Sequence, residues 1–128
     1  MLKIALAAAL VVTSSFAELK WASSYDAAFA QAKKEKKQVM VMLSKEDCPA
    51  CDYMNDIVFE EKTVTDDVHK RYVPVHLDIH NDFIPDGLSY IGTPTFYFMD
   101  ANGKKVGRHD GAANIPTFLG ILRKAGGK

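Results

Sequence analysis

This chain of 128 residues has only two cysteines, no excess of charge of either sign and few long apolar runs. Two cysteines are too few for the disulfide network that stabilises small secreted domains without a core. The 16 Lys and Arg residues balance the 16 Asp and Glu residues. Without a basic surplus to neutralise phosphates, nucleic acid is not an expected partner. Repeats and low-complexity tracts are also absent, and the length fits one compact domain.

The N-terminal segment has the pattern of a secretory signal peptide. A basic residue precedes the apolar run Ile4 to Val12, which is too short to span a bilayer. Small residues then lead to a cleavage site between Ala17 and Glu18. We therefore predict a signal peptide over 1–17 and a mature domain over 18–128, acting in the periplasm or after secretion. An uncleaved anchor or a buried N-terminal helix is the alternative.

Hydrophobic periodicity in the mature chain predicts helices that alternate with strands. Residues 38–44 form a nearly continuous apolar run, the pattern of a strand that is buried on both faces. Asn102-Gly103 indicates a hairpin between the last two strands. The expected elements are a helix over 21–37 behind a Ser23-x-x-Asp26 capping box, a strand over 38–44, two helices or one broken helix over 53–72 with a Thr63-x-x-Asp66 cap, strands over 73–79, 95–99 and 104–108, and a helix that begins after Asn114 and ends before Gly126.

This order predicts an α/β fold with a mixed central sheet of about four strands, flanked by helices and preceded by an extra N-terminal helix. Most apolar side chains are expected in its core, including four methionines that could be mistaken for soft metal ligands. Strand alternation places Tyr97 opposite to its neighbours and suggests that it is exposed. His109 and Asp110 are expected just after the last strand, where substrate contact is conceivable.

The chemistry is concentrated in Cys48-Pro49-Ala50-Cys51, where a buried strand ends and a helix begins. A separation of three residues on a helix brings two cysteines within disulfide distance. Cys48 would cap the helix, where free backbone N–H groups favour a thiolate, and is therefore the candidate nucleophile. Pro49 suits the first helical position. Cys51 lies one turn further and is the candidate resolving thiol.

Four other uses of the cysteines remain open. A structural disulfide closing so short a loop would contribute little stability. Zinc would need further ligands, and the four histidines have no ligand spacing. Copper binding or delivery through Cys48 and Cys51 is an alternative of a different class, because soft thiolates select Cu(I). A docking protein whose cysteines only respond to redox state is the fourth.

The sequence resembles the thioredoxin-fold superfamily, in particular its small exported members that begin with a Trp, Ala and Lys-rich helix. The resemblance covers most of the mature chain. It is carried by the CPAC motif behind a buried strand, Leu77-Asp78, Gly92-Thr93-Pro94-Thr95, the hairpin from Asp100 to Lys104, Gly111 and the amphipathic last helix.

The resemblance implies a thiol:disulfide oxidoreductase of the cell envelope that needs no cofactor beyond its redox-active disulfide. Cys48 and Cys51 would be catalytic, and Pro94 would be a cis-proline that leaves Thr93 free to pair with a substrate segment. Pro49 and Ala50 would complete the substrate contacts. Expected partners are proteins with disulfides or thiols and a membrane or periplasmic electron donor. The expected state is a monomer, and a reductase or isomerase role is favoured.

The chain departs from better-known thioredoxins at positions that handle protons. A buried Asp six residues before the first cysteine is replaced by Met42, and Pro74 stands where a strand lysine is usual. Glu46 and Asp47 precede Cys48, where a Trp is common. Proton transfer at Cys51 therefore needs another route, with water, Glu46 and Asp78 as candidates.

Overall fold

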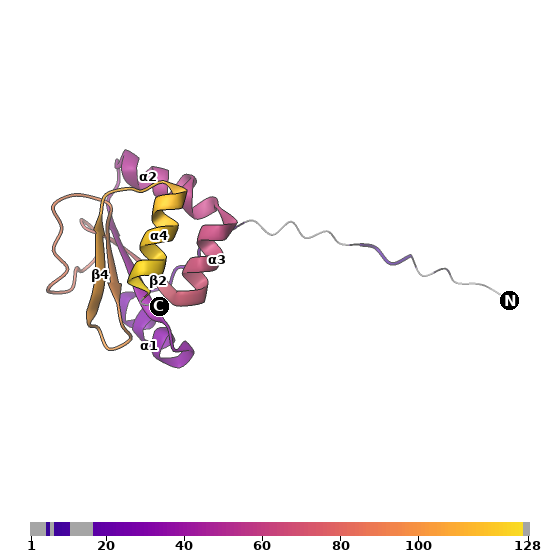
Figure 1. Cartoon of the computed structure of the whole chain (residues 1–128), viewed down its shortest axis with the longest axis horizontal. Coiled ribbons are helices and arrows are strands. Elements are labelled where there is room, and N and C mark those ends of the chain that lie inside the picture. The colour runs from indigo at the N-terminus through magenta and orange to yellow at the C-terminus, as the bar shows by residue number, and fades with distance from the viewer. Residues whose placement is uncertain (1–4, 6, 11–16, 127–128) are drawn as a thin grey trace.

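A four-stranded sheet forms the centre of the computed structural model, which describes residues 5, 7–10 and 17–126 (Figure 1). The predicted signal peptide, residues 1–17, lies mostly outside the described residues. The elements are α1 (Tyr25–Glu35), β1 (Gln38–Ser44), α2 (Pro49–Asp56), the 3-10 helix η1 (Val58–Glu60), α3 (Lys62–Arg71), β2 (Tyr72–Asp78), β3 (Thr95–Met99), β4 (Lys105–Asp110) and α4 (Ile115–Ala125). In these ranges no helix combines the length and apolar character needed to cross a membrane.

The strands lie in the order β2-β1-β3-β4, with β1 parallel to β2 and the other two pairs antiparallel. Six of the seven residues of β1 are buried, as expected for an interior strand that is covered on both faces. The mixed sheet, the flanking helices and the extra N-terminal helix confirm the predicted fold class.

Two hydrophobic clusters cover the two faces of the sheet. On one face, Met40 and Met42 pack with residues of α2, η1, α3 and α4, and both cysteines belong to this cluster. On the other face, Val39, Val41 and Leu43 pack with α1 and with Leu88 of the connection between β2 and β3. Alternate side chains of β1 therefore enter the two clusters, and those of Met40 and Met42 lie on the face that carries the cysteines.

Several predicted boundaries were wrong by one to four residues. Ser24, rather than Ser23, caps α1 by accepting a hydrogen bond from the Ala27 amide, and the helix ends at Glu35 before Lys36 in a left-handed conformation. α3 begins at Lys62 after Glu61, so Thr63 is already inside the helix. Strand β2 begins and ends one residue earlier than predicted. The predicted Asn114 cap of α4 is present, and its side chain accepts from the Thr117 amide.

The predicted hairpin between β3 and β4 is also present. Gly103 has a φ of 87°, a conformation that L side chains rarely adopt, and its amide donates to the Asp100 carbonyl. The strand that follows runs to Asp110 rather than stopping at Arg108. His109 and Asp110 are therefore strand residues, paired with Phe96 and Thr95.

Candidate active site

Cys48 and Cys51 form a disulfide at the N-terminus of α2, with their Cα atoms 5.2 Å apart. Cys48 is the N-cap residue, and Pro49 occupies the first turn as predicted. Both cysteines are buried, whereas Pro49 is exposed and Ala50 is partly exposed. Asp47 precedes the pair with a φ of 54°, a left-handed conformation that Asp tolerates better than most residues.

Two hydrogen-bond donors converge on the sulfur of Cys48. The Cys51 amide donates to Cys48 Sγ at 3.1 Å, and the Thr93 hydroxyl donates to the same atom at 3.3 Å. The Thr93 carbonyl oxygen lies 3.6 Å from this sulfur. Donors of this kind stabilise a thiolate once the disulfide is reduced. The arrangement suits Cys48 as a nucleophile and Cys51 as a partner that can close on it.

A groove of about 330 Å³ lies beside Thr93, the residue whose hydroxyl contacts Cys48 Sγ. Thr93 and Pro94 line it on one side, and Asp110 and Gly111 line it on the other. The peptide bond between Thr93 and Pro94 is cis. Ile91 also lines the groove, and 93% of its surface is exposed. Ile91 was not foreseen from the sequence, because one apolar residue in a long connection carries no periodic signal.

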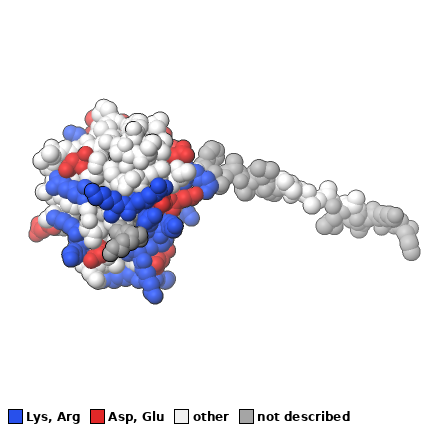
Figure 2. All heavy atoms as spheres, viewed as in Figure 1, with Lys and Arg blue, Asp and Glu red and all other residues white. Residues whose placement is uncertain are grey.

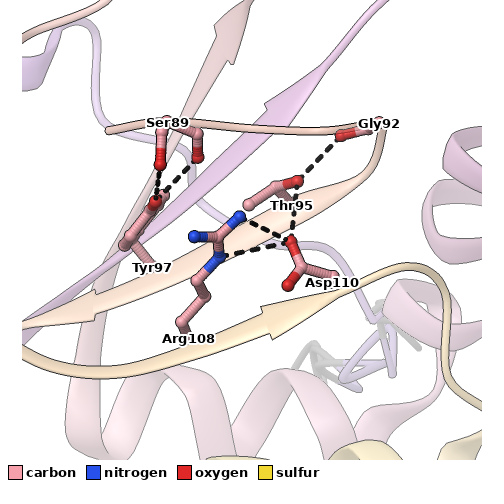
Figure 3. A network of polar contacts seen from close by, with 6 residues as sticks. All are labelled: Ser89, Gly92, Thr95, Tyr97, Arg108 and Asp110. Carbon is pink, nitrogen blue, oxygen red and sulfur yellow. Dashed lines mark hydrogen bonds and ion pairs between the residues drawn. The ribbon is translucent and has the colours of Figure 1, made fainter. Parts of the chain in front are cut away.

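A polar network holds the segment from Ser89 to Gly92 against the sheet (Figure 3). The Tyr97 hydroxyl donates to the Ser89 carbonyl oxygen at 2.7 Å, and the Thr95 hydroxyl donates to the Gly92 carbonyl oxygen at 2.8 Å. Arg108 donates to Asp110 Oδ1 at 3.0 Å, which fixes the carboxylate beside Thr95. The network therefore sets the position of Ile91 relative to Thr93.

Tyr97 corrects one prediction made from strand alternation. Its side chain does point away from those of Phe96 and Phe98, but only 2% of it is exposed. Tyr97 belongs to the cluster that packs with α1. Lys105 and Arg108 lie over its ring, at 5.2 and 5.3 Å from the centroid. Alternation identified the face but could not reveal that both faces are covered.

None of the acids suggested for proton transfer at Cys51 is buried. Glu46 is exposed. Asp78 is half-buried, and its carboxylate accepts hydrogen bonds from the amides of His80 and Asn81, which lower the pKa of the carboxyl. Met42 is fully buried on the sheet face that carries the cysteines. The position of the usual acid is therefore apolar.

Two histidines flank Met42 across the sheet. Met42 pairs with His76 on β2 and with Phe96 on β3, and Phe96 pairs with His109 on β4. Cross-strand partners project from the same face, so these four side chains form one row beside the cysteine cluster. This row was not foreseen, because it depends on the register between four strands.

The methionines are core residues, as predicted. Met40, Met42, Met54 and Met99 are all buried. The Met54 sulfur accepts from the Ala113 amide at 3.4 Å, and the Met99 sulfur accepts from the Tyr25 hydroxyl at 3.7 Å. In the part of the chain that the structure describes, no three His, Cys, Asp or Glu side chains are grouped to hold a metal ion. The copper alternative finds no support there.

A mixed four-stranded sheet with a CxxC pair at the first helix after the central strand, and a cis-proline beside it, defines the thioredoxin fold. A family model described as a thioredoxin-like domain matches residues 25–126. The chain therefore belongs to the thioredoxin-like family, whose members with such a cysteine pair are thiol:disulfide oxidoreductases. A search of curated proteins gives no match.

Solved structures agree with this assignment. A thioredoxin from Thermus thermophilus is 30% identical, with a TM-score of 0.71 over 86% of this chain and 91% of that one. The periplasmic thioredoxin SoxS from Paracoccus pantotrophus is 22% identical, with a TM-score of 0.58 over 71% of this chain and 97% of that one. The C-terminal domain of DsbD from Neisseria meningitidis, in its reduced form, is 18% identical, with a TM-score of 0.65 over 78% and 92%. The last two show the fold alone.

Proposed function

We propose that this protein exchanges disulfides with protein substrates in the cell envelope, with Cys48 as the nucleophile and Cys51 as the resolving thiol. The observation that carries the proposal is the pair of donors, at 3.1 and 3.3 Å, that converge on Cys48 Sγ beside an open groove. In the reducing direction, the Cys48 thiolate attacks a substrate disulfide and forms a mixed disulfide. Cys51 then displaces the reduced substrate and closes the bond with Cys48.

The groove between Thr93 and Asp110 would receive the substrate chain. The backbone of Thr93 would pair with an extended segment, Pro49 and Ala50 would contact its end, and exposed Ile91 would meet an apolar side chain. No cofactor is needed, since the dithiol itself carries two electrons. The protein would act as a monomer and would be reduced by a membrane or periplasmic electron donor.

An envelope location rests on the predicted signal peptide and on the likeness to SoxS, which is described as periplasmic. Export is tested by measuring the mass of the protein recovered from the envelope of an expressing bacterium. Cleavage between Ala17 and Glu18 would leave residues 18–128. Recovery of the uncleaved chain in the cytoplasm would contradict the location.

The reductase or isomerase direction is favoured because the described residues include no helical domain inserted into the fold, unlike the oxidising exported relatives. Equilibration with reduced and oxidised glutathione, read by mass after alkylation, measures the potential of the pair. We expect a value near or below about −230 mV, in the range of reductants. A value near about −120 mV would instead indicate an oxidant.

Insulin reduction tests the exchange activity itself. Wild-type protein should accelerate it in the presence of a dithiol reductant, and Cys48→Ser should abolish the effect. If the two proteins were equally active or equally inactive, catalysis by this pair would be unsupported. Copper titration of the reduced protein tests the alternative, which would need stoichiometric uptake.

A further inference from the structure

The resolving step of the proposed exchange requires a proton acceptor for Cys51, and the following inference rests on that proposed function. A thiol attacks a disulfide only as the thiolate, so Cys51 must lose its proton before it displaces the substrate. Cys51 is 2% exposed, and Met42 occupies the position where an acid would be expected. Neither Glu46 nor Asp78 is buried near the cluster that contains Cys51.

A cavity of about 480 Å³, open to solvent, reaches α2 at Asn55. Asn55 lines this cavity and lies four residues after Cys51, which places both on the same helix face. Leu19 and Phe59 also line it, and both pack in the same hydrophobic cluster as Cys51. At roughly 30 Å³ per molecule, the volume accommodates several waters. Water can therefore approach to within about one helical turn of the resolving thiol.

His76 forms part of the wall of the same cavity. Its Nε2 atom shares a hydrogen bond with the hydroxyl of Ser44, which is buried at the end of β1. Its ring packs edge-on against Trp21, with the centroids 5.8 Å apart. These contacts hold the imidazole in place. In the tautomer whose Nε2–H donates to Ser44 Oγ, Nδ1 is the nitrogen that can take up a proton.

Burial of the imidazole favours the neutral form of His76. Burial lowers the pKa of His76 below its ordinary value, although Asp78 and Asp82 raise it in part. The other charged groups that face the two cavities bordering His76 are Glu18, Glu60 and Asp26. A neutral imidazole is a proton acceptor, whereas an imidazolium is not.

His109, the other histidine of the row, is placed differently. Its Nε2 atom is buried and lacks a hydrogen-bond partner among the described residues, and its ring packs on Phe96 with the centroids 6.5 Å apart. None of the described cavities is lined by it. It shares the sheet face and lies at the other end of the same row, one strand further from Met42, so it provides a control.

We propose that His76, held by Ser44, accepts through cavity water the proton that Cys51 loses when it resolves the mixed disulfide. The proton passes from Cys51 to water and from water to Nδ1 of His76. The Cys51 thiolate then bonds to Cys48 Sγ, while the bond between Cys48 and the substrate sulfur breaks. The substrate leaves as a thiolate and takes up a proton, and His76 returns its own to solvent. His76 acts through water and does not touch the reacting sulfur atoms, so it is a positioning residue rather than a catalytic one.

The test separates the resolving step from the first attack. Reduced protein is mixed with increasing oxidised glutathione, quenched and alkylated, and the mixed disulfide and the closed disulfide are quantified by mass. At high glutathione the rate of closure becomes independent of its concentration and reports resolution alone. Cys51→Ser, which traps the mixed disulfide, reports the first attack alone.

In wild-type protein, we expect the resolution rate to fall about tenfold per pH unit below the pKa of His76 and to level off above it. His76→Gln should remove this limb and slow resolution at pH 7 by about 10²-fold, the lower range of general-base catalysis. Its first attack should be unchanged. Imidazole added to the buffer should restore part of the rate through the open cavity, which a purely structural defect would not allow.

His109→Gln should keep the wild-type profile. Ser44→Ala, which leaves the imidazole in place but unanchored, should slow resolution less than His76→Gln and provides a second variant if the latter does not fold. An unchanged profile in His76→Gln, or an equal loss in His109→Gln, would overturn the inference. If wild-type protein formed no mixed disulfide at all, the proposed function would fail instead.

Discussion

Thr93 is the residue that links the cis-proline turn to the chemistry at Cys48. Its hydroxyl donates to Cys48 Sγ at 3.3 Å, and no other side chain among the described residues donates a hydrogen bond to this sulfur. A hydrogen bond to a charged group is worth about 1.5–3 kcal/mol, which is at least a factor of ten in an equilibrium. The threonine should therefore govern how much of Cys48 is thiolate at neutral pH.

Replacing Thr93 with valine tests this role, since valine has the same shape without the hydroxyl. We expect the reaction of reduced Cys48 with iodoacetamide at pH 7 to slow by about tenfold, because less thiolate is present. Thr93→Ser retains a hydroxyl and should react nearly as fast as wild type. Equal rates for the valine and serine variants would show that the hydroxyl does not stabilise the thiolate.

At the scale of elements, the connection between β2 and β3 places exposed apolar side chains both at the groove and away from it. It carries two strongly exposed apolar residues, Phe83 and Ile91, at 83% and 93%. Only Ile91 lines the groove beside Thr93 and Pro94, whereas Phe83 borders a cavity near α1. One exposed apolar side chain, that of Ile91, thus lies at the site, and the other, that of Phe83, lies away from it.

Ile91→Ser and Phe83→Ser form a matched pair. If a substrate chain occupies the groove, Ile91→Ser should raise the KM for a protein disulfide several-fold, since each buried CH2 contributes about 0.8 kcal/mol. The kcat should change little, because the cysteines are untouched. Phe83→Ser should leave both constants unchanged. Steady-state kinetics with insulin measures both, and equal effects of the two variants would contradict substrate binding at Ile91.

The Tyr97 hydroxyl ties this connection to β3 through Ser89. Tyr97→Phe removes the donor to the Ser89 carbonyl while keeping the ring that packs under Lys105 and Arg108. We expect a loss of about 1 kcal/mol in the free energy of unfolding. Backbone hydrogen exchange should increase over residues 88–93 and stay unchanged in β1. A uniform increase across the protein would mean that the hydroxyl does not act locally.

On the scale of the whole molecule, charge is distributed unevenly although the net charge is zero. Figure 2 shows Lys and Arg side chains gathered over the lower part of the face, while the top, where α2 lies in Figure 1, is mostly uncharged. The last turns of α1, α3 and α4 supply Lys33, Lys34, Lys70, Arg71, Arg123 and Lys124. Cations in these positions complement the helix dipoles. In this view the cations gather away from the end where α2 lies.

Two histidine contacts should make the stability of the whole domain depend on pH. The Lys20 amide donates to His69 Nε2 at 3.0 Å, which ties the segment before α1 to α3. Burial, together with Lys20 and Lys37, lowers the pKa of His69, and burial lowers that of His76. The unfolded chain therefore binds protons at a higher pH than the folded one. The stability from these groups is present above about pH 6.5 and is lost as the pH falls toward their folded pKa values.

Urea unfolding at about pH 7.5 and pH 5 measures this dependence. Wild-type protein should be less stable at the lower pH, and His69→Gln should show a smaller difference between the two. His80→Gln alters an exposed histidine and should retain the wild-type difference. Equal stability of the wild type at both pH values would contradict the assignment.

The order of the elements, the central position of β1 and the place of the cysteines at a helix N-terminus were determined by the sequence alone. These features depend on apolar spacing, caps and turns, which act over a few neighbouring residues. The resemblance to thioredoxins added the roles of Thr93 and Pro94. Boundaries were less certain, since adjacent serines at 23 and 24 offer equivalent caps.

Only the tertiary structure decided which distant side chains meet. Thr93 lies 45 positions from Cys48, and Ser44 meets His76 across a parallel strand pair. The row that places His76 and His109 on either side of Met42 requires three strand registers at once. A register shift of one residue would turn those side chains to the opposite face. Packing of the whole sheet sets the register, and local sequence patterns do not specify it.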